Sequence, residues 1–362
     1  MFYALMGGVL LLAFANGAND NFKGVATLWG TGRYPYRTVL LWGTFCTFAG
    51  SVAAMTLAGG LLRIFNGSRF LGTATSLDPG FLAAVALGGA TTVLLATRLG
   101  APISTTHALT GSLVGAGLLA VGAVGIKWAA LVTAVALPLL ISPLLAMGLT
   151  LGVFPPLARW LRSRSCLCLT EPAPLLLDSG DAARAARGFW PALRLAHRSD
   201  CTRGDELSRW NTEVLVHWSS AGVISFARGL NDTPKIAALL LSAPLLGATT
   251  TFVLIAAAMA VGGLLAAVGV ARTMSQRVTR IEPVPGTSAN LVGALLVGMA
   301  SRWGVPVSTT HVTMGGIFGV GLHQRAQTNW MLARQIVLAW VVTFPLGLAG
   351  GLGFYSLLKT LA

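Results

Sequence analysis

Long apolar runs separated by short polar segments dominate the chain. Four of these runs are each long enough to cross a hydrocarbon core of ~30 Å: Leu40–Leu62, Trp128–Val153, Ala243–Val270 and Gln335–Leu358. The alternation of apolar and polar positions that a membrane β-barrel requires is absent from the sequence. The pattern therefore predicts an all-α polytopic membrane protein, because a helix satisfies its own backbone hydrogen bonds in lipid.

Shorter apolar runs predict further membrane segments. Met1–Ala15 lacks the basic start of a signal peptide and continues into a polar motif, so it is interpreted as the first membrane helix. Phe81–Arg98 and Ala108–Val121 fit either full spans or the arms of re-entrant hairpins. Together the runs predict about 10–12 membrane segments.

Two polar blocks occur twice, in the same order. Phe14–Ala26 and Phe226–Ala238 share seven identities in thirteen positions at an offset of 212 residues. Leu99–Gly117 and Trp303–Gly321 share nine identities in nineteen positions at an offset of 204. Hydrophobic composition alone would reproduce Leu and Val, but not Asn-Asp or Ser-Thr-Thr-His. The chain is therefore an internal duplication.

The duplication divides the chain into three parts. Residues 1–158 form the first membrane repeat, residues 159–210 a polar linker, and residues 211–362 the second repeat. Internal repeats, often inverted, are typical of secondary transporters, whose substrate site lies near the bilayer midplane where the copies meet. We expect the same arrangement here, with no cofactor.

Composition and charge agree with this class of protein. Only 10% of the residues are charged and the mean hydropathy is +0.74, whereas a soluble domain carries about 25% charged residues. Nine arginines fall in the linker between Arg159 and Arg209, and such connections stay on the cytoplasmic side. No aromatic stacking pattern or known binding module accompanies them, so nucleic acid is not an expected partner despite the net charge of +14.

Acidic and basic side chains recur in the first duplicated block. Asp20 and Asp232 are equivalent, and so are Lys23 and Lys235. An ionisable group at membrane depth costs at least ~2.5–3.5 kcal/mol and normally faces a cavity or a partner. Spacings of three and four residues place each set on one helix face, in two stripes: Asn16, Asn19, Asp20 and Lys23, and Arg228, Asn231, Asp232 and Lys235.

The Asn-Asp pairs are candidate cation ligands. Gly17 and Gly229 precede them and allow either a helix break or the close approach of another backbone. A broken helix offers free carbonyls beside a carboxylate, and these are the oxygen ligands that sodium prefers. The alternative is that Asp20–Lys23 and its equivalent are intrahelical ion pairs that only neutralise one another.

The second duplicated block predicts an anion site. Pro102 and Pro306 disfavour helix at the preceding residue and favour a break between two short helices. Ser104 and Ser308 then stand at the N-cap position, and helix N-termini bind phosphate or sulfate through free N–H groups and the helix dipole. The alternative is plain capping of a membrane helix. His107 and His311 fit either a packed, loop-orienting role or proton coupling.

The Asn-Asp pairs at Gly17–Asp20 and Gly229–Asp232, with two Pro-x-Ser-Thr-Thr-His segments, resemble the inorganic phosphate transporter (PiT) family. The resemblance covers both repeats and implies two inverted repeats with broken helices and paired hairpins around a central phosphate, in a homodimer of the inner membrane. It implies cation-coupled symport of inorganic phosphate, with sodium or a proton as the coupling ion. It assigns two groups of residues: cation-binding Asn19, Asp20, Asn231 and Asp232, with sodium at the two aspartates, and phosphate-binding Ser104, Thr105, Thr106, Ser308, Thr309 and Thr310.

The sequence departs from the family at Lys23, where the first motif commonly carries Asn. Lys235 is familiar from proton-coupled bacterial relatives. We assign both lysines to the phosphate site, and the departure at Lys23 leaves sodium or proton coupling open.

Three other functions are alternatives to phosphate symport. A sulfate or other oxyanion transporter of the same fold is the nearest alternative, since both anions are tetrahedral. An intramembrane hydrolase would use Ser104, His107 and Asp20 as a triad, but a triad needs one asymmetric constellation and the motifs are duplicated. A channel is disfavoured by ionisable residues of both signs in each repeat.

Overall fold

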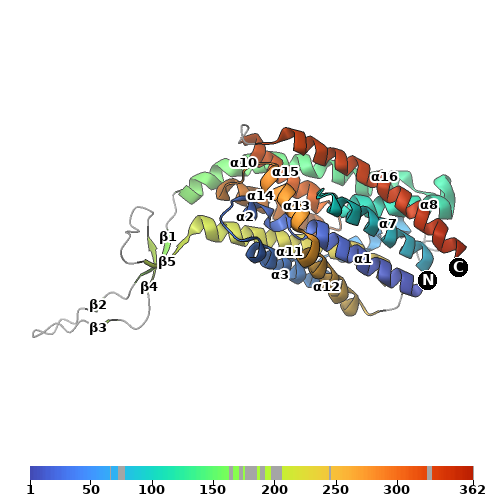
Figure 1. Ribbon diagram of the computed structural model, residues 1–362, viewed down its shortest axis with the longest axis horizontal. Helices are drawn as coiled ribbons and strands as arrows, with labels where there is room; N and C mark the ends of the chain where they lie inside the picture. The colour runs from blue at the N-terminus through green and yellow to red at the C-terminus, as the bar shows by residue number, and fades with distance from the viewer. Residues whose placement is uncertain are drawn as a thin grey trace, which may run out of the picture.

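The computed structural model describes residues 1–65, 67–71, 78–162, 166–170, 174–175, 186–187, 192–196, 206–243, 246–323 and 328–361. Its membrane part is a bundle of packed helices, with both chain ends at the side opposite the linker (Figure 1). The predicted helical class is confirmed.

The helices before the linker follow the predicted apolar runs. They are α1 (Phe2–Asp20), η1 (Lys23–Val25), α2 (Ala26–Gly30), α3 (Tyr36–Leu57), η2 (Gly59–Leu61), α4 (Leu62–Phe65), α5 (Ser68–Leu71), α7 (Pro79–Arg98), α8 (Thr105–Gly125), α9 (Trp128–Leu131), the π-helical turn η3 (Val132–Ala136) and α10 (Leu137–Arg162).

The helices after the linker begin with α11, and the predicted division into two repeats and a linker stays a prediction. They are α11 (Thr212–Leu241), α12 (Ala248–Ala266), α13 (Val268–Arg272), the π-helical turn η4 (Thr273–Arg277), α14 (Pro283–Arg302), α15 (Thr309–His323) and α16 (Trp330–Thr360).

Eight helical segments of the described residues are long and apolar enough to cross a membrane. Two other helices are not in this set: α11, which is 30 residues long and carries buried charges, and α15, which has 15 residues. The expected total of about 10–12 membrane segments stays a prediction. The two alternatives for α7 and α8, full spans or the arms of a re-entrant hairpin, both stay predictions.

The linker contains short strands that the sequence analysis did not anticipate. Strand β1 (Cys166–Thr170) pairs antiparallel with β4 (Ala192–Ala196) and β5 (Glu206–Asn211), and β2 (Pro174–Leu175) pairs with β3 (Ala186–Arg187). These pairings join segments far apart in the chain, so no local pattern signals them. The rest of the linker lies outside the described residues, and its cytoplasmic location stays a prediction.

Helices pack mainly across the two halves of the chain. α1 lies against α12 and α11 against α3, while α8 lies against α16 and α10 against α15. Two equivalent glycines make the first contacts close: a Cβ at Gly17 would collide with the carbonyl of Met259, and one at Gly229 with the carbonyl of Thr47. These glycines could permit either a helix break or the close approach of another backbone, and the structure shows the close approach.

The helices that carry the Asn-Asp motifs lie side by side and run in opposite directions. Thr27 contacts His217, Gly24 faces Ser225, and Asn21 bonds to Arg228. Residue numbers in α11 therefore rise as the residue numbers of their contact partners in 21–27 fall, so the two segments are antiparallel. Figure 1 shows the same order, since α1 starts beside the N-terminus and α11 starts at the linker end.

The predicted helix break occurs in one copy only. α1 ends at Asp20 and the chain continues through η1 into α2, whereas α11 continues unbroken through Asp232 and Pro234. In the second copy the structure therefore shows only the other alternative, the close approach of another backbone. In the first copy, η1 lies so close to α11 that a Cβ at Gly24 would clash with Ser225.

Gly17→Ala is expected to destabilise the protein by about 1–3 kcal/mol, because the added methyl overpacks the contact with α12. Thermal unfolding in detergent measures the effect. Gly7→Ala is the matched control, since a Cβ there meets nothing within 4 Å. Equal unfolding temperatures for the two variants would contradict the close-packing role.

Candidate functional site

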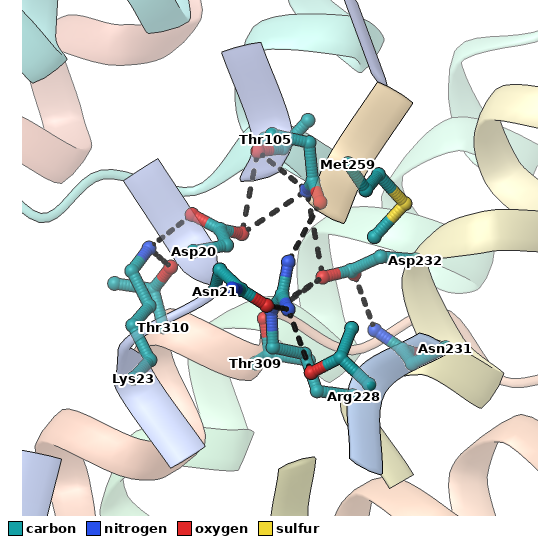
Figure 2. Close-up of polar contacts among 12 residues, drawn as sticks. Asp20, Asn21, Lys23, Thr105, Arg228, Asn231, Asp232, Met259, Thr309 and Thr310 are labelled. Carbon is teal, nitrogen blue, oxygen red and sulfur yellow. Dashed lines mark hydrogen bonds and ion pairs between the residues drawn. The ribbon is translucent and has the colours of Figure 1, made fainter. Parts of the chain in front are cut away.

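Asp20 is buried at the end of α1, with 1% of its surface exposed. Its Oδ1 pairs with the ammonium of Lys23, three residues further along the chain. Its Oδ2 accepts hydrogen bonds from the Asn16 amide at 3.2 Å and the Thr105 hydroxyl at 3.3 Å. The carboxylate therefore joins α1 to the start of α8 (Figure 2).

Asp232 repeats this arrangement in α11. Its Oδ1 accepts from the Lys235 ammonium at 3.2 Å and the Asn231 amide at 3.0 Å. Its Oδ2 accepts from the Thr309 hydroxyl at 3.3 Å and lies 3.7 Å from Nε of Arg228. Each aspartate thus binds its own lysine and the first threonine of its own Ser-Thr-Thr segment.

The lysines cross between the two halves of the chain. Besides Asp20, Lys23 donates to the backbone carbonyl of Ile103 at 2.7 Å and to the hydroxyl of Thr310, as Figure 2 shows for Thr310. Thr310 in turn donates to the Ile103 carbonyl at 2.5 Å. One ammonium therefore holds together α1, the α7–α8 connection and α15.

Lys235 makes the reciprocal bridge. Its ammonium donates to the Val307 carbonyl at 2.7 Å and to the hydroxyl of Thr106 at 2.8 Å. Both lysines are buried, at 0% and 3% exposure. All four threonines of the duplicated segment thus meet the two Asp–Lys pairs, and the structure brings these predicted site residues together.

Asn19 and Asn231 form hydrogen bonds to the backbone of the α7–α8 and α14–α15 connections. Asn19 donates to the carbonyl of Ala101 at 3.0 Å and accepts from the N–H of Ile103 at 3.2 Å. Asn231 donates to the carbonyl of Val307 at 3.1 Å. Their amides therefore position the Pro-x-Ser-Thr-Thr segments, and their role as cation ligands stays a prediction.

Ser104 and Ser308 occupy the predicted capping position. Ser104 is the N-cap of α8 and accepts from the N–H of His107 at 3.2 Å; Ser308 does the same for His311 before α15. The preceding helices end in left-handed turns at Gly100 (φ 65°) and at the equivalent Gly304. The break and the cap are confirmed, and direct anion contact by the serines stays a prediction.

The two histidines pack on one another, outside the aspartate–lysine network. Their ring centroids are 4.7 Å apart, and Nδ1 of His311 lies 3.0 Å from the Leu139 carbonyl. The hydroxyl of Ser104 bonds to the backbone of His107, while Asp20 bonds to the groups described above. These residues therefore do not form a hydrolytic triad.

Arg228 and Asn16 are central residues that the sequence analysis did not assign to the site. Arg228 is 1% exposed and donates to the side-chain oxygens of Asn16 at 2.9 Å and of Asn21 and Thr47 at 3.1 Å. Asn16 also reaches Asp232 at 3.5 Å. The sequence signal was their place in the polar stripes, at equivalent positions of the two repeats.

The centre carries an excess of positive charge when all its groups are ionised. Two carboxylates, Asp20 and Asp232, face three cationic groups, Lys23, Lys235 and Arg228, all at 3% exposure or less. Buried charges of this kind are retained for function more often than for stability. Such a centre inside a helical membrane bundle is typical of membrane transport proteins.

Comparison with known proteins identifies the family. The model of the phosphate transporter family matches residues 16–351, so the chain belongs to the phosphate transporter family. It is a multi-pass membrane protein, and its similarity to bacterial transporters indicates the inner membrane.

Several relatives are similar over most of their length. The chain is 29% identical to a probable low-affinity inorganic phosphate transporter of Rhizobium meliloti, covering 94% of this chain and 91% of the relative. It is 28% identical to one of Mycobacterium bovis, covering 97% and 76%. A solved structure titled as the sodium-dependent phosphate transporter has the same fold, with a TM-score of 0.76, 20% identity and coverage of 100% and 99%.

Thr310→Val is expected to lower the free energy of unfolding by about 1–3 kcal/mol, because the buried Lys23 ammonium loses an acceptor from the other half of the chain. Thermal unfolding of the purified protein measures it. Thr310→Ser keeps the hydroxyl and should stay close to wild type. A stability loss equal in both variants would show that packing, rather than the bridge, is responsible.

Proposed function

We propose that the protein carries inorganic phosphate across the inner membrane in symport with a cation. The observation that carries this proposal is the crossed arrangement of two Asp–Lys pairs and four threonine hydroxyls at the ends of α8 and α15. The names of the relatives support phosphate as the substrate.

The anion is held by Lys23, Lys235 and Arg228, together with hydroxyls from Thr105, Thr106, Thr309 and Thr310. A dianionic or monoanionic oxyanion complements the excess positive charge of the centre. Helix N-termini of α8 and α15 add their dipoles to this attraction.

The ion pair that each lysine forms with an aspartate couples anion binding to cation binding. Lys23 is held by Asp20, and Lys235 is held by Asp232. A cation bound at either carboxylate, sodium or a proton, neutralises it and releases the lysine for the anion. The anion is then bound strongly only with its co-transported cation, which is the requirement for symport.

Sulfate is the less favoured substrate. Hydrogen phosphate can donate a hydrogen bond to a site carboxylate, whereas sulfate has no proton to donate. Both aspartates lie beside the threonines that would hold the anion.

Two architectural expectations belong to the same proposal. Two features support two inverted repeats: residues 21–27 run antiparallel to α11, and the two lysine bridges are reciprocal. A homodimer is expected from the family resemblance.

Asp20→Asn and Asp232→Asn are each expected to abolish concentrative phosphate uptake, because the carboxylate that binds the cation is lost. Uptake of labelled phosphate into proteoliposomes, under imposed sodium or proton gradients and with sulfate as competitor, measures this. Asp78→Asn is the matched control: Asp78 caps α7 through the N–H groups of Gly80 and Phe81, and Asn caps equally well. Normal accumulation by either central variant would refute the cation-site assignment.

Lys23→Asn is expected to raise the sodium dependence of uptake or to weaken phosphate binding. The ammonium occupies the place of a cation beside Asp20, so its removal exposes the carboxylate to sodium. Uptake is measured as a function of sodium concentration and pH. Unchanged sodium and pH dependence together with unchanged affinity would place Lys23 outside the transport site.

A further inference from the structure

Equivalent positions of the two repeats differ sharply on the linker side of the central site. Four buried residues on this side are polar, whereas the equivalent residues of the other repeat, found at the offsets of 212 and 204 residues, are small or apolar. The pairs are His217 with Leu5, Ser220 with Gly8, Thr27 with Leu239, and Asn290 with Ala86.

The four polar residues form one connected group, here called the linker-side polar cluster: Thr27, His217, Ser220 and Asn290. The Thr27 hydroxyl donates to Oδ1 of Asn290 at 3.0 Å and lies 3.0 Å from Nε2 of His217. The Asn290 amide donates to Ser220 at 3.3 Å. Each is at most 2% exposed, and Nδ1 of His217 has no hydrogen-bond partner among the residues that the structure describes.

The cluster lies between the central site and a polar pocket at the linker end of the bundle. Thr27 follows Lys23 by four residues, through η1 into α2. The pocket has a volume of about 370 Å³ and is lined by charged side chains and by the end of α10: Arg33, Glu213, Arg280, Glu282, Phe154 and Ala158.

Ile281 and Gly286 stand at the boundary between the cluster and this pocket. A Cβ at Gly286 would lie 3.0 Å from Nε2 of His217, 3.0 Å from Cγ2 of Ile281 and 3.2 Å from Cβ of Thr27. Ile281 therefore lines the pocket and lies beside Gly286, whose backbone packs against the polar cluster.

On the side of the central site away from the linker, the equivalent residues are apolar or small and lie in the hydrophobic core. Leu5, Ala86 and Leu239 are 0% exposed and belong to one apolar core with Val9 and Leu82. Parting these helices would expose apolar surface to water, which is unfavourable. Parting the helices around the polar cluster exposes groups that exchange one hydrogen-bond partner for water at small net cost.

We propose that the linker-side polar cluster lines the route by which the oxyanion moves between the central site and the linker side, with Ile281 and Gly286 as its gate. This proposal rests on the proposed transport function. As α2 and α14 separate from α11, water and the anion replace the hydrogen bonds among the four side chains. The Asn290 amide, the two hydroxyls and the His217 ring supply donors along the way.

Thiol labelling tests the route directly. Asn290→Cys is compared with Ala86→Cys, its equivalent on the opposite side, using a membrane-impermeant maleimide on each face of membrane vesicles. Peptide mass spectrometry reads the label at each cysteine separately, so the introduced thiol is distinguished from the native ones. The native linker residues Cys166, Cys168 and Cys201 report which face is the linker face.

The thiol of Asn290→Cys should react from the linker face at least about tenfold faster than that of Ala86→Cys from the opposite face, because the polar side opens at lower cost. Equal rates, or reaction of Asn290→Cys only from the face opposite the linker, would overturn the proposal. This readout requires no transport, so it is independent of the proposed function.

A conservative pair of variants tests the route in the transport reaction. Thr27→Val keeps the shape and loses the hydroxyl, so it should lower the initial rate of phosphate uptake about fivefold, with phosphate binding to the purified protein unchanged. Thr27→Ser should retain the wild-type rate. A wild-type rate in Thr27→Val, or an equal loss of binding, would refute the route. Absence of uptake by the wild type would refute the proposed function instead.

Discussion

Charged side chains buried inside a membrane bundle must find their partners within the protein, and this requirement governs the central architecture. Asp20, Asp232, Lys23, Lys235 and Arg228 are all buried, and water or lipid cannot compensate them cheaply. Each lysine satisfies its ammonium with its own aspartate, a backbone carbonyl at a helix break and a threonine from the other half of the chain. The charged centre therefore determines where the two halves and their helix breaks meet.

The close approach of the helices makes this pairing geometrically feasible. Gly17 and Gly229 let the motif-bearing helices touch the backbones of α12 and α3, and small residues at such contacts are how membrane helices approach closely. Since each contact joins the two halves, neither half can form its part of the centre alone. Packing and charge compensation are thus two aspects of one inter-repeat interface.

The duplication is symmetric in most of its central residues and asymmetric at one central position and on the linker side. The Asp, Lys, Ser, Thr and His positions match in both copies, but Arg228 replaces Asn16, and the linker side carries hydrogen-bonded residues where the opposite side is apolar. In the proposed function, the matched residues would let one bound anion contact both repeats, and the asymmetric residues would make the two faces differ in the cost of opening.

The sequence by itself determined the helical membrane class, the duplication and the Ser caps before α8 and α15, and it left the Asp–Lys ion pairs as an alternative that the structure shows. Each of these depends on local composition or on spacing along one helix, which sequence periodicity reports directly. Only the tertiary structure decided that the lysines bridge to Thr310 and Thr106, that Arg228 and Asn16 belong to the centre, and that α11 continues where α1 breaks. It also decided the strand pairing in the linker. These features depend on contacts between residues tens to hundreds of positions apart, such as the close contact of Gly24 with Ser225, which no pattern within one segment encodes.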